Sequence, residues 1–493
     1  MKKAYAALLC IAVLFGVSLP VSAAGSKVPY DNYTYSETDG SVILSPQAYL
    51  PEKVIYGSSL SVGNFINPTD LDVDEKGDIY ILDEGNNRVV VITSDYELKM
   101  VFDCNSVEND GSLKPLNKAS GINVSEKYVY ISDTENSRVM LFDKLNGEYV
   151  KSYYMTGSSV LGEDFIFKPT KTATDSEGNL YVVSNGTYEG LLNIKENGEF
   201  LSFFASNKVT ASPWTLFWRR FSTKRQRETS EQLIPQQFSS IDMDSDGFYF
   251  VTTYTAISNS MVKRVNPGGN NVIRNLSNID LIGDPAKYYS GSLSGVSSFS
   301  DVSAGPYKIY ACLDKTRGKI FCYNYDGYLL YTFGTISTQD GGFTAPAAIS
   351  YLSDERIAVL DSTRGSVTVF SPTHYAKEIN LSIYYQNELE YDEALKHWNK
   401  VLEYNSNYEL ALNMIGTSYY GSGDYDKAIE YFIASNNNSM YSDTKKAMRS
   451  EWIYEHQWLL VALVVLIVAY IVIKCVLRLI KIFKNRYKSP ESE

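Results

Sequence analysis

Short runs in which hydrophobic and polar residues alternate fill the middle of the chain, from Val54 to Phe370. Gly77 to Asp83 shows the pattern, because an acidic glycine turn leads into a strand of isoleucine, tyrosine and leucine. Runs of this kind, bounded by Gly, Asn and Asp, are typical of half-buried β-strands. After Ala376 the hydrophobic residues recur every three or four positions, which predicts helices. The chain is therefore expected to be mainly β with an α-helical appendage.

The β region is built from a repeated unit. Asp83 and Arg88 recur fifty residues later as Asp133 and Arg138, each pair joined by a polar turn. Four further units follow with more drift, and in the fifth of the six Lys319 stands at the arginine position. Each unit has room for four short strands, which is the make-up of a β-propeller blade. Six units predict six blades.

The run Gly-Asp-Ile-Tyr-Ile-Leu-Asp, followed by Asn-Asn-Arg-Val, resembles the NHL repeat. The resemblance is most specific in the first two units. It implies a six-bladed propeller over residues 52–375, used mostly as a binding platform, with residues 24–51 as a lead-in and Glu52 to Tyr56 completing the last blade. The repeated turn residues are expected to close the blades and not to act on a ligand: Asp83, Arg88, Asp133, Arg138, Asp314 and Asp361.

Residues 376–454 contain a helical repeat with a period of 34 residues. Its small and aromatic positions are Tyr385, Ala394 and Trp398 in one copy, and Gly416, Tyr419, Ala428 and Phe432 in the next. This period and these residue types resemble the tetratricopeptide repeat, in which small residues let helices approach and aromatic residues fill the gap. A third helix, Ser442 to Tyr454, is expected to cap the pair. The module is either a groove for a peptide or partner helix, or a stiff spacer.

Both ends of the chain carry membrane signals. Residues 1–23 have the pattern of a cleavable signal peptide, with two lysines before an apolar core and small residues before the cleavage point. Residues 458–480 are long enough to span a bilayer core of roughly 30 Å. A basic tail, residues 481–493, follows the span, which places the C-terminus in the cytoplasm and disfavours a buried core helix. We expect a single-pass type I protein of a bacterial cell membrane, with its bulk outside the cytoplasm.

An insertion at about residues 207–233 separates the third and fourth units. Its aromatic residues fall on one face of a predicted helix, and basic residues cover much of the rest. The aromatic face either packs on the propeller or touches anionic lipid or an acidic partner. The candidate residues for contact with a partner or membrane are Trp214, Phe217, Trp218, Arg219, Arg220, Lys224 and Arg225.

Composition narrows the function. The formal net charge is −12 although both ends are basic, so the predicted exported part is strongly acidic, which argues against nucleic-acid binding. The 3 histidines, His374, His397 and His456, lie after the propeller strands and offer few metal ligands or general bases to a blade. Cys312 and Cys322 either bond across a hairpin or remain buried free thiols.

The sequence holds no nucleophile elbow, phosphate-binding glycine loop or Cys-x-x-Cys pair. No catalytic, cofactor or metal residue is therefore predicted. A calcium-dependent, lactonase-like hydrolase is the enzymatic alternative, since acidic propeller loops can supply oxygen ligands for Ca²⁺. A structural spacer is the second alternative. The leading hypothesis is a membrane-anchored extracytoplasmic scaffold that recognises a protein or ligand, as part of an envelope or transport complex.

Overall fold

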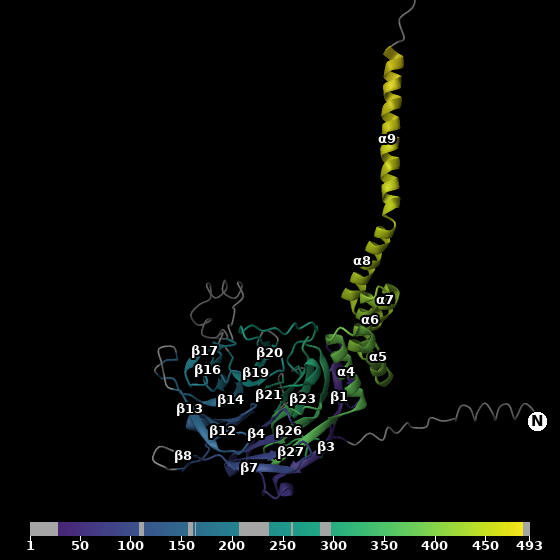
Figure 1. Cartoon of the computed structure of the whole chain (residues 1–493). Helices are drawn as coiled ribbons and strands as arrows, with labels where there is room; N and C mark the ends of the chain where they lie inside the picture. The colour runs from purple at the N-terminus through teal and green to yellow at the C-terminus, as the bar shows by residue number, and fades with distance from the viewer. Residues whose placement is uncertain are drawn as a thin grey trace, which may run out of the picture. The chain divides into compact units, whose positions relative to one another are not determined.

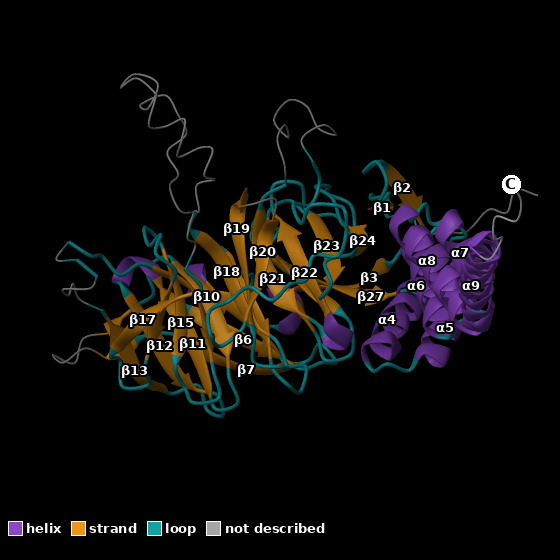
Figure 2. Cartoon of the chain, turned by 90° about the horizontal axis from the view of Figure 1, so that it is seen from above, coloured by secondary structure: helices purple, strands orange, loops and turns teal. Residues whose placement is uncertain are grey.

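The computed structural model describes residues 28–107, 113–155, 161–162, 164–206, 236–257, 260–285 and 297–486. The chain divides between His397 and Trp398 into two compact units. The first unit is a six-bladed β-propeller with a helix, and the helical region after the propeller holds six helices among the described residues (Figures 1 and 2). The predicted fold class is confirmed.

The blades are antiparallel sheets whose strands follow one another in chain order. Blade 1 contains β4 (Pro68–Val73), β5 (Ile79–Asp83), β6 (Arg88–Ile92) and β7 (Leu98–Asp103). Blade 2 contains β10 (Ala119–Val124), β11 (Tyr128–Asp133), β12 (Arg138–Asp143) and β13 (Tyr149–Tyr154). Blade 3 contains β14 (Pro169–Thr174), β15 (Leu180–Ser184), β16 (Leu191–Ile194) and β17 (Phe200–Phe204). A small two-stranded sheet, β8 (Ser106–Val107) with β9 (Leu113–Lys114), follows blade 1.

Blade 4 departs from the pattern of four strands, because only three of its strands lie in the described residues. Blade 4 contains β18 (Phe238–Met243), β19 (Tyr249–Ile257) and β20 (Ser260–Val265). Blade 5 contains β21 (Phe299–Ala304), β22 (Ile309–Asp314), β23 (Lys319–Asn324) and β24 (Leu329–Phe333). Blade 6 contains β25 (Pro346–Tyr351), β26 (Ile357–Asp361), β27 (Ser366–Pro372) and β3 (Tyr49–Tyr56). The segment after β20 contacts its edge, where Met261 N donates to Leu281 O at 2.8 Å.

The ring of blades is closed by a strand from the start of the propeller sequence. β3 pairs with β27, and the register runs from Ser366 opposite Tyr56 to Pro372 opposite Tyr49. The first and last parts of the propeller sequence therefore share one hydrogen-bonded sheet. This shared sheet closes the ring of blades at the junction. The prediction that this segment completes the last blade is confirmed.

The core lies between neighbouring blades. Ile79 and Ile81 of β5 pack into the cluster shared with blade 6, whereas Tyr80 and Leu82 pack into the cluster shared with blade 2. Successive side chains of a strand point to opposite faces, so a strand covered on both faces is hydrophobic throughout. This explains why the central strand of each blade is a continuous apolar run.

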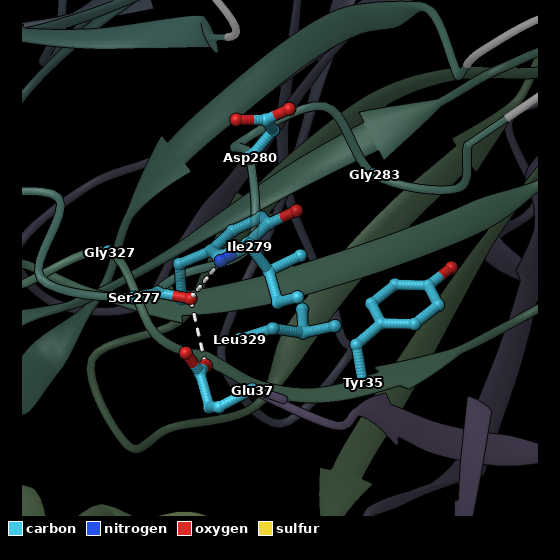
Figure 3. Close-up of a pocket in the computed structure, with 9 residues that line it drawn as sticks. Tyr35, Glu37, Ser277, Ile279, Asp280, Gly283, Gly327 and Leu329 are labelled. Atoms are coloured by element: carbon cyan, nitrogen blue, oxygen red, sulfur yellow. Dashed lines mark hydrogen bonds between the residues drawn. The ribbon is translucent and has the colours of Figure 1, made fainter. Parts of the chain in front are cut away.

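The lead-in contributes a hairpin of β1 (Asn32–Tyr35) and β2 (Val42–Ser45). The hydroxyls of Tyr33 and Tyr35 both donate to Asp284, and Tyr33 N donates to Thr332 Oγ1 at 3.3 Å. The hairpin is thereby fastened to blade 5. A small pocket beneath it, drawn in Figure 3, has a volume of about 10 Å³, and there Ser277 donates to Glu37 at 2.8 Å. That space fits about one water molecule.

The first helix after the propeller, α4 (His374–Asn387), belongs to the propeller unit. Tyr331 donates its hydroxyl to Asn380 Oδ1 at 2.8 Å, and the rings of Tyr307 and Tyr384 lie 5.3 Å apart. The sequence-based boundary at residues 375 and 376 falls within the first turn of this helix. These side-chain contacts join α4 to blade 5, which a change of hydrophobic period does not reveal.

The remaining helices are α5 (Tyr391–Tyr404), α6 (Glu409–Gly421), α7 (Tyr425–Ala434), α8 (Asn438–Glu455) and α9 (Gln457–Arg486). In the second unit α6 and α7 pack closely, since a Cβ added at Gly416 would lie 2.8 Å from the ring of Phe432. Gln457–Lys484 is, within the described residues, the one helix long and apolar enough to cross a membrane, judged by length and composition. It is the long yellow helix of Figure 1.

Candidate binding site at the mouth of the propeller

The inner strand of every blade begins with the same irregularity. Its first residue pairs with the last residue of the second strand, or in blade 4 with Thr253 inside that strand. The next residue is bulged, and regular pairing then resumes. A β-bulge inserts one extra residue and redirects its side chain. The bulged residues are Thr69, Ser120, Thr170, Ser239, Ser300 and Ala347. All but Ala347 carry a hydroxyl, and we call these the hydroxyl ring.

The bulged residues all line one cavity, which we call the mouth. It has a volume of about 590 Å³ and receives side chains from all six blades. The other lining residues are Asn67, Pro68, Lys171, Asn185, Gln237, Phe238, Tyr254, Lys315, Thr316, Ile336, Thr344, Ala345, Pro346 and Ser362. No Asp or Glu occurs among these described lining residues, although the whole chain is acidic. The volume falls in the range of roughly 300–1,000 Å³ that is usual for small-molecule sites.

Four members of the hydroxyl ring use their protons on the backbone. Ser120 Oγ donates to Thr170 O at 3.1 Å, and Ser239 Oγ donates to Phe299 O at 2.8 Å. Both carbonyls belong to the next blade. Thr170 and Ser300 donate to carbonyls of the second strand in their own blades, each at 3.2 Å. Because a hydroxyl has one proton and two lone pairs, these groups keep acceptor capacity.

Thr69 is the exception in the hydroxyl ring. Its Oγ1 is buried and has no hydrogen-bond partner within the described part of the chain. A buried polar group without a partner costs roughly 1–3 kcal/mol. Burial of the Thr69 hydroxyl therefore lowers the stability of the fold, unlike burial of the other four hydroxyls, which are hydrogen-bonded.

Lys171 spans the floor of the mouth. Its ammonium nitrogen lies 2.6 Å from Asp70 Oδ1 and 2.9 Å from Asp301 Oδ1, so a residue of blade 3 joins blades 1 and 5. Burial opposes the charged form, but the two carboxylates outweigh it and raise the pKa of Lys171 above its ordinary value. Lys171 is therefore an ammonium group at neutral pH. It acts as a bridge across the channel and not as a nucleophile.

The two carboxylates that hold Lys171 also cap open strand edges. Asp70 Oδ2 accepts from Ile122 N at 2.7 Å, and Asp301 Oδ2 accepts from Ile349 N at 2.9 Å. An inner strand has no partner on its channel side, so its free N–H groups need acceptors. Each aspartate supplies a carboxylate oxygen as acceptor to a backbone N–H of the next blade.

A second layer of carboxylates does the same further along the inner strands. Asp72 accepts from Val124 N and Asp242 accepts from Ala304 N, each at 2.7 Å. Burial raises the pKa of Asp72 to about 7, and the charge of Asp242 adds to the effect. Burial likewise raises the pKa of Asp242 to about 7. Within the described residues, no group of three or more His, Cys, Asp and Glu is placed to hold a metal ion.

Tyr254 and Lys315 form the exposed wall of the mouth. They come from blades 4 and 5, and Lys315 Nζ lies 5.5 Å from the centre of the Tyr254 ring. Tyr254 is 43% exposed, and no carboxylate among the described residues forms an ion pair with Lys315. Burial of its remaining surface raises the pKa of Tyr254, so the phenol keeps its proton. The pair presents one aromatic ring and one uncompensated positive charge.

The predicted turn residues of blades 1 and 2 bind the protein's own backbone. Asp83 Oδ2 accepts from Arg88 Nε at 2.7 Å, and Arg88 Nη1 donates to Val62 O at 2.6 Å. In blade 2 Asp133 and Arg138 repeat the pair at 2.7 Å, with both side chains completely buried. These contacts tie the loop entering each blade to the turn after its second strand.

Blades 5 and 6 keep the aspartate but change the arginine. Asp314 pairs with Arg317 at 2.9 Å. Lys319, which the sequence placed at the arginine position, is opposite Asp314 in register but lies over the ring of Tyr33 at 4.5 Å. Lys319 thus occupies the arginine position in register, as predicted, but Arg317 is the residue that pairs with the carboxylate, from within the turn itself. In blade 6, Asp361 Oδ2 accepts from a backbone N–H, Thr344 N, at 2.6 Å.

The helical positions predicted from the 34-residue period are largely internal. Trp398, Ala428 and Phe432 have no exposed surface, and neither has Ala394. The ring of Tyr385 stacks on His397 at 5.3 Å in the first unit. In the second unit Tyr419 stacks on Tyr431 at 5.7 Å. These residues pack helices, and the likeness to tetratricopeptide repeats stays a prediction.

Two other predictions have different outcomes. Residues 214–225, which include every predicted partner or membrane contact of the insertion, lie outside the described residues. Cys312 lies opposite Phe321, and Cys322 lies opposite Ala311, so the two thiols are offset by one position. Both are buried and free. Successive residues face opposite sides of a strand, which explains why this pair does not bond.

Comparison with known proteins supports the repeat and adds no chemistry. The NHL repeat model matches residues 65–92. A human protein, NHL repeat-containing protein 3, is 33% identical over 101 residues, which is 20% of this chain and 28% of that protein. The chain thus spans less than a third of that relative's length.

Solved structures with a similar backbone trace include virginiamycin B lyase from Staphylococcus aureus. It is 12% identical with a TM-score of 0.41, and the match covers 66% of this chain and 99% of that one. A protein of unknown function from Bacteroides thetaiotaomicron is 13% identical with a TM-score of 0.42, covering 70% of this chain and 76% of that one. Likenesses at these values assign no activity to this chain.

The mouth was missed by reasoning from the sequence, although a weak signal was present. The second residue of the inner strand is Thr or Ser in five of the six blades, in the pairs Pro-Thr, Ala-Ser, Pro-Thr, Phe-Ser and Phe-Ser. Strand alternation predicts on which face of a sheet a side chain lies, but a bulge shifts the alternation by one residue. The face of this residue can therefore be assigned only if the bulge is known.

Proposed function

We propose that this protein is a membrane-anchored extracytoplasmic binding scaffold, and that the mouth of the propeller is its recognition site. The observation that carries the proposal is the mouth itself, a cavity of about 590 Å³ lined by polar side chains from all six blades. The floor beneath it is fixed by Lys171, which is held by two carboxylates. A rigid polar cavity on a closed scaffold is suited to recognition.

The anchor in this proposal is α9. Gln457–Lys484 has the length and composition of a span, and the basic residues that follow favour a cytoplasmic C-terminus. The helical region from α5 to α8 would then connect the propeller to the membrane, either as a peptide groove or as a spacer. The partner is expected to be an envelope component.

Site-specific photocrosslinking in intact cells tests the proposal. A benzoylphenylalanine at exposed Thr344 reports on the mouth, and the same group at Glu199, on the turn between β16 and β17, is the matched control. We expect a discrete crosslinked species from position 344 and none from position 199. Equal crosslinking at both positions, or none at 344, would contradict recognition at the mouth and favour a spacer.

A further inference from the structure

The mouth offers many hydrogen-bond acceptors and little charge. Ser120, Thr170, Ser239 and Ser300 donate their protons to backbone carbonyls, so the capacity that they retain is mainly lone pairs. A ligand that satisfies such a ring must bring donors. Molecules with several hydroxyl groups bring donors at many angles, whereas a simple anion brings none.

The rim of the mouth adds hydroxyls that have no hydrogen-bond partner within the described residues. Thr316 and Thr344 line the cavity and are exposed, and their backbone N–H groups, not their side chains, bond to Asp314 and Asp361. Their hydroxyls can therefore both donate and accept. The rim thus matches the mixed donor and acceptor pattern of a sugar.

Tyr254 and Lys315 set the remaining chemistry. An exposed aromatic ring supplies an apolar face for the C–H side of a sugar ring. Lys315 supplies the positive charge of the wall, whereas Lys171 is already ion-paired with Asp70 and Asp301. A ligand carboxylate placed near Lys315 gains a charge-assisted hydrogen bond.

We propose that the mouth binds an acidic sugar, a polyhydroxylated ring that bears one carboxylate. The proposal rests on the mouth being the recognition site. Ligand hydroxyls donate to the ring of serine and threonine oxygens, the carboxylate pairs with Lys315, and the sugar ring lies along Tyr254. No Asp or Glu occurs in the described lining, and the carboxylates of Asp70 and Asp301 in the floor are bound to Lys171.

Calorimetric titration of the purified full chain in detergent tests the ligand class. The probes are D-glucuronate, D-galacturonate and N-acetylneuraminate, with D-glucose and D-galactose as neutral partners and acetate as the bare anion. We expect at least one acidic sugar to bind about tenfold more tightly than its neutral partner, since a hydrogen bond to a charged group is worth roughly 1.5–3 kcal/mol. Acetate should show no measurable binding.

Two variants and one control assign the contacts. Lys315→Ala should abolish the preference for the acidic sugar, and Thr316→Val should weaken binding of acidic and neutral sugars alike by about threefold to tenfold. Lys427→Ala removes a lysine that lies over Tyr419 at 4.9 Å in the second unit, and it should change neither affinity.

Several results would overturn the proposal. Acetate binding as tightly as the acidic sugars would indicate a simple anion site, and equal losses in Lys315→Ala and Lys427→Ala would indicate non-specific attraction. If no sugar binds while position 344 still crosslinks, the ligand class is wrong and the recognition site stands. If both experiments fail, the proposed function fails as well.

Discussion

The turn motif and the hydroxyl ring lie at the same end of the propeller but use their polar atoms differently. Asp133 and Arg138 are fully buried and spend their hydrogen bonds on each other and on the backbone. Ser120 and Ser239 also bond the backbone, yet they line an open cavity and keep lone pairs. The motif that is most visible in the sequence therefore serves the fold. The less visible position, one residue into each inner strand, shapes the surface.

The largest expected effect comes from breaking the turn motif where it is buried. Arg138→Ala leaves Asp133 without its charge partner, and removing one member of a buried pair typically costs roughly 3–5 kcal/mol. Unfolding can be followed by near-ultraviolet circular dichroism of the tyrosines. Arg88→Ala is the matched control and should cost less, because the Arg88 side chain is 18% exposed. Equal losses would show that burial does not govern the motif.

A smaller effect is expected where two inner strands approach closely. A Cβ added at Gly121 would lie 2.3 Å from Thr170 O and 3.1 Å from Lys171 Cα, so Gly121→Ala must push blades 2 and 3 apart. Overpacking of this kind costs roughly 1–3 kcal/mol. Gly162→Ala, at a position where nothing lies within 4 Å of the added Cβ, is the spatial control, although its positive φ of +88° adds some strain. An unchanged stability of Gly121→Ala would contradict the close packing.

The carboxylates of the second layer predict a pH dependence. The folded pKa values of Asp72 and Asp242, about 7, lie above the unfolded value, so the folded state binds protons more tightly. Their contribution to stability is therefore fully present below about pH 4 and is lost as the pH rises towards 7. Urea unfolding of the full chain between pH 4 and pH 8 measures this loss.

Asp242→Asn isolates one of these groups. The variant should show a shallower fall in unfolding free energy over that pH interval than the parent chain. The difference combines the titration of Asp242 itself with the lowering of the Asp72 pKa that follows when the charge of Asp242 is removed. A variant with the same slope would place the raised pKa elsewhere.

The smallest effect is expected at Thr69. Its hydroxyl is buried without a partner in the described residues, so Thr69→Val removes an unmet polar group while keeping the shape of the side chain. The unfolding free energy should stay within about 0.5 kcal/mol of the parent or rise slightly. Ser239→Ala is the comparison, since that hydroxyl bonds Phe299 O, and it should destabilise by about 1 kcal/mol. A larger loss at Thr69 than at Ser239 would contradict the distinction.

Much of the fold could be predicted because it depends on local patterns. Alternating strands, acidic glycine turns and the recurrence of Asp83 as Asp133 define blades, and the segment at residues 52–56 was correctly expected to close them. The contact of Lys171 with Asp70 joins residues 101 positions apart, which no local pattern encodes. Lys319 was placed correctly in register, but the pairing of Asp314 with Arg317 was not foreseen, because register alone does not say which basic side chain reaches the carboxylate.

The most direct test of the account is a structure of the full chain determined with D-glucuronate, D-galacturonate or N-acetylneuraminate present. We predict that the sugar lies in the mouth, with its carboxylate at Lys315 and its hydroxyls on the serine and threonine oxygens of the ring. An empty mouth, with the sugar bound at full occupancy elsewhere on the molecule, would contradict it.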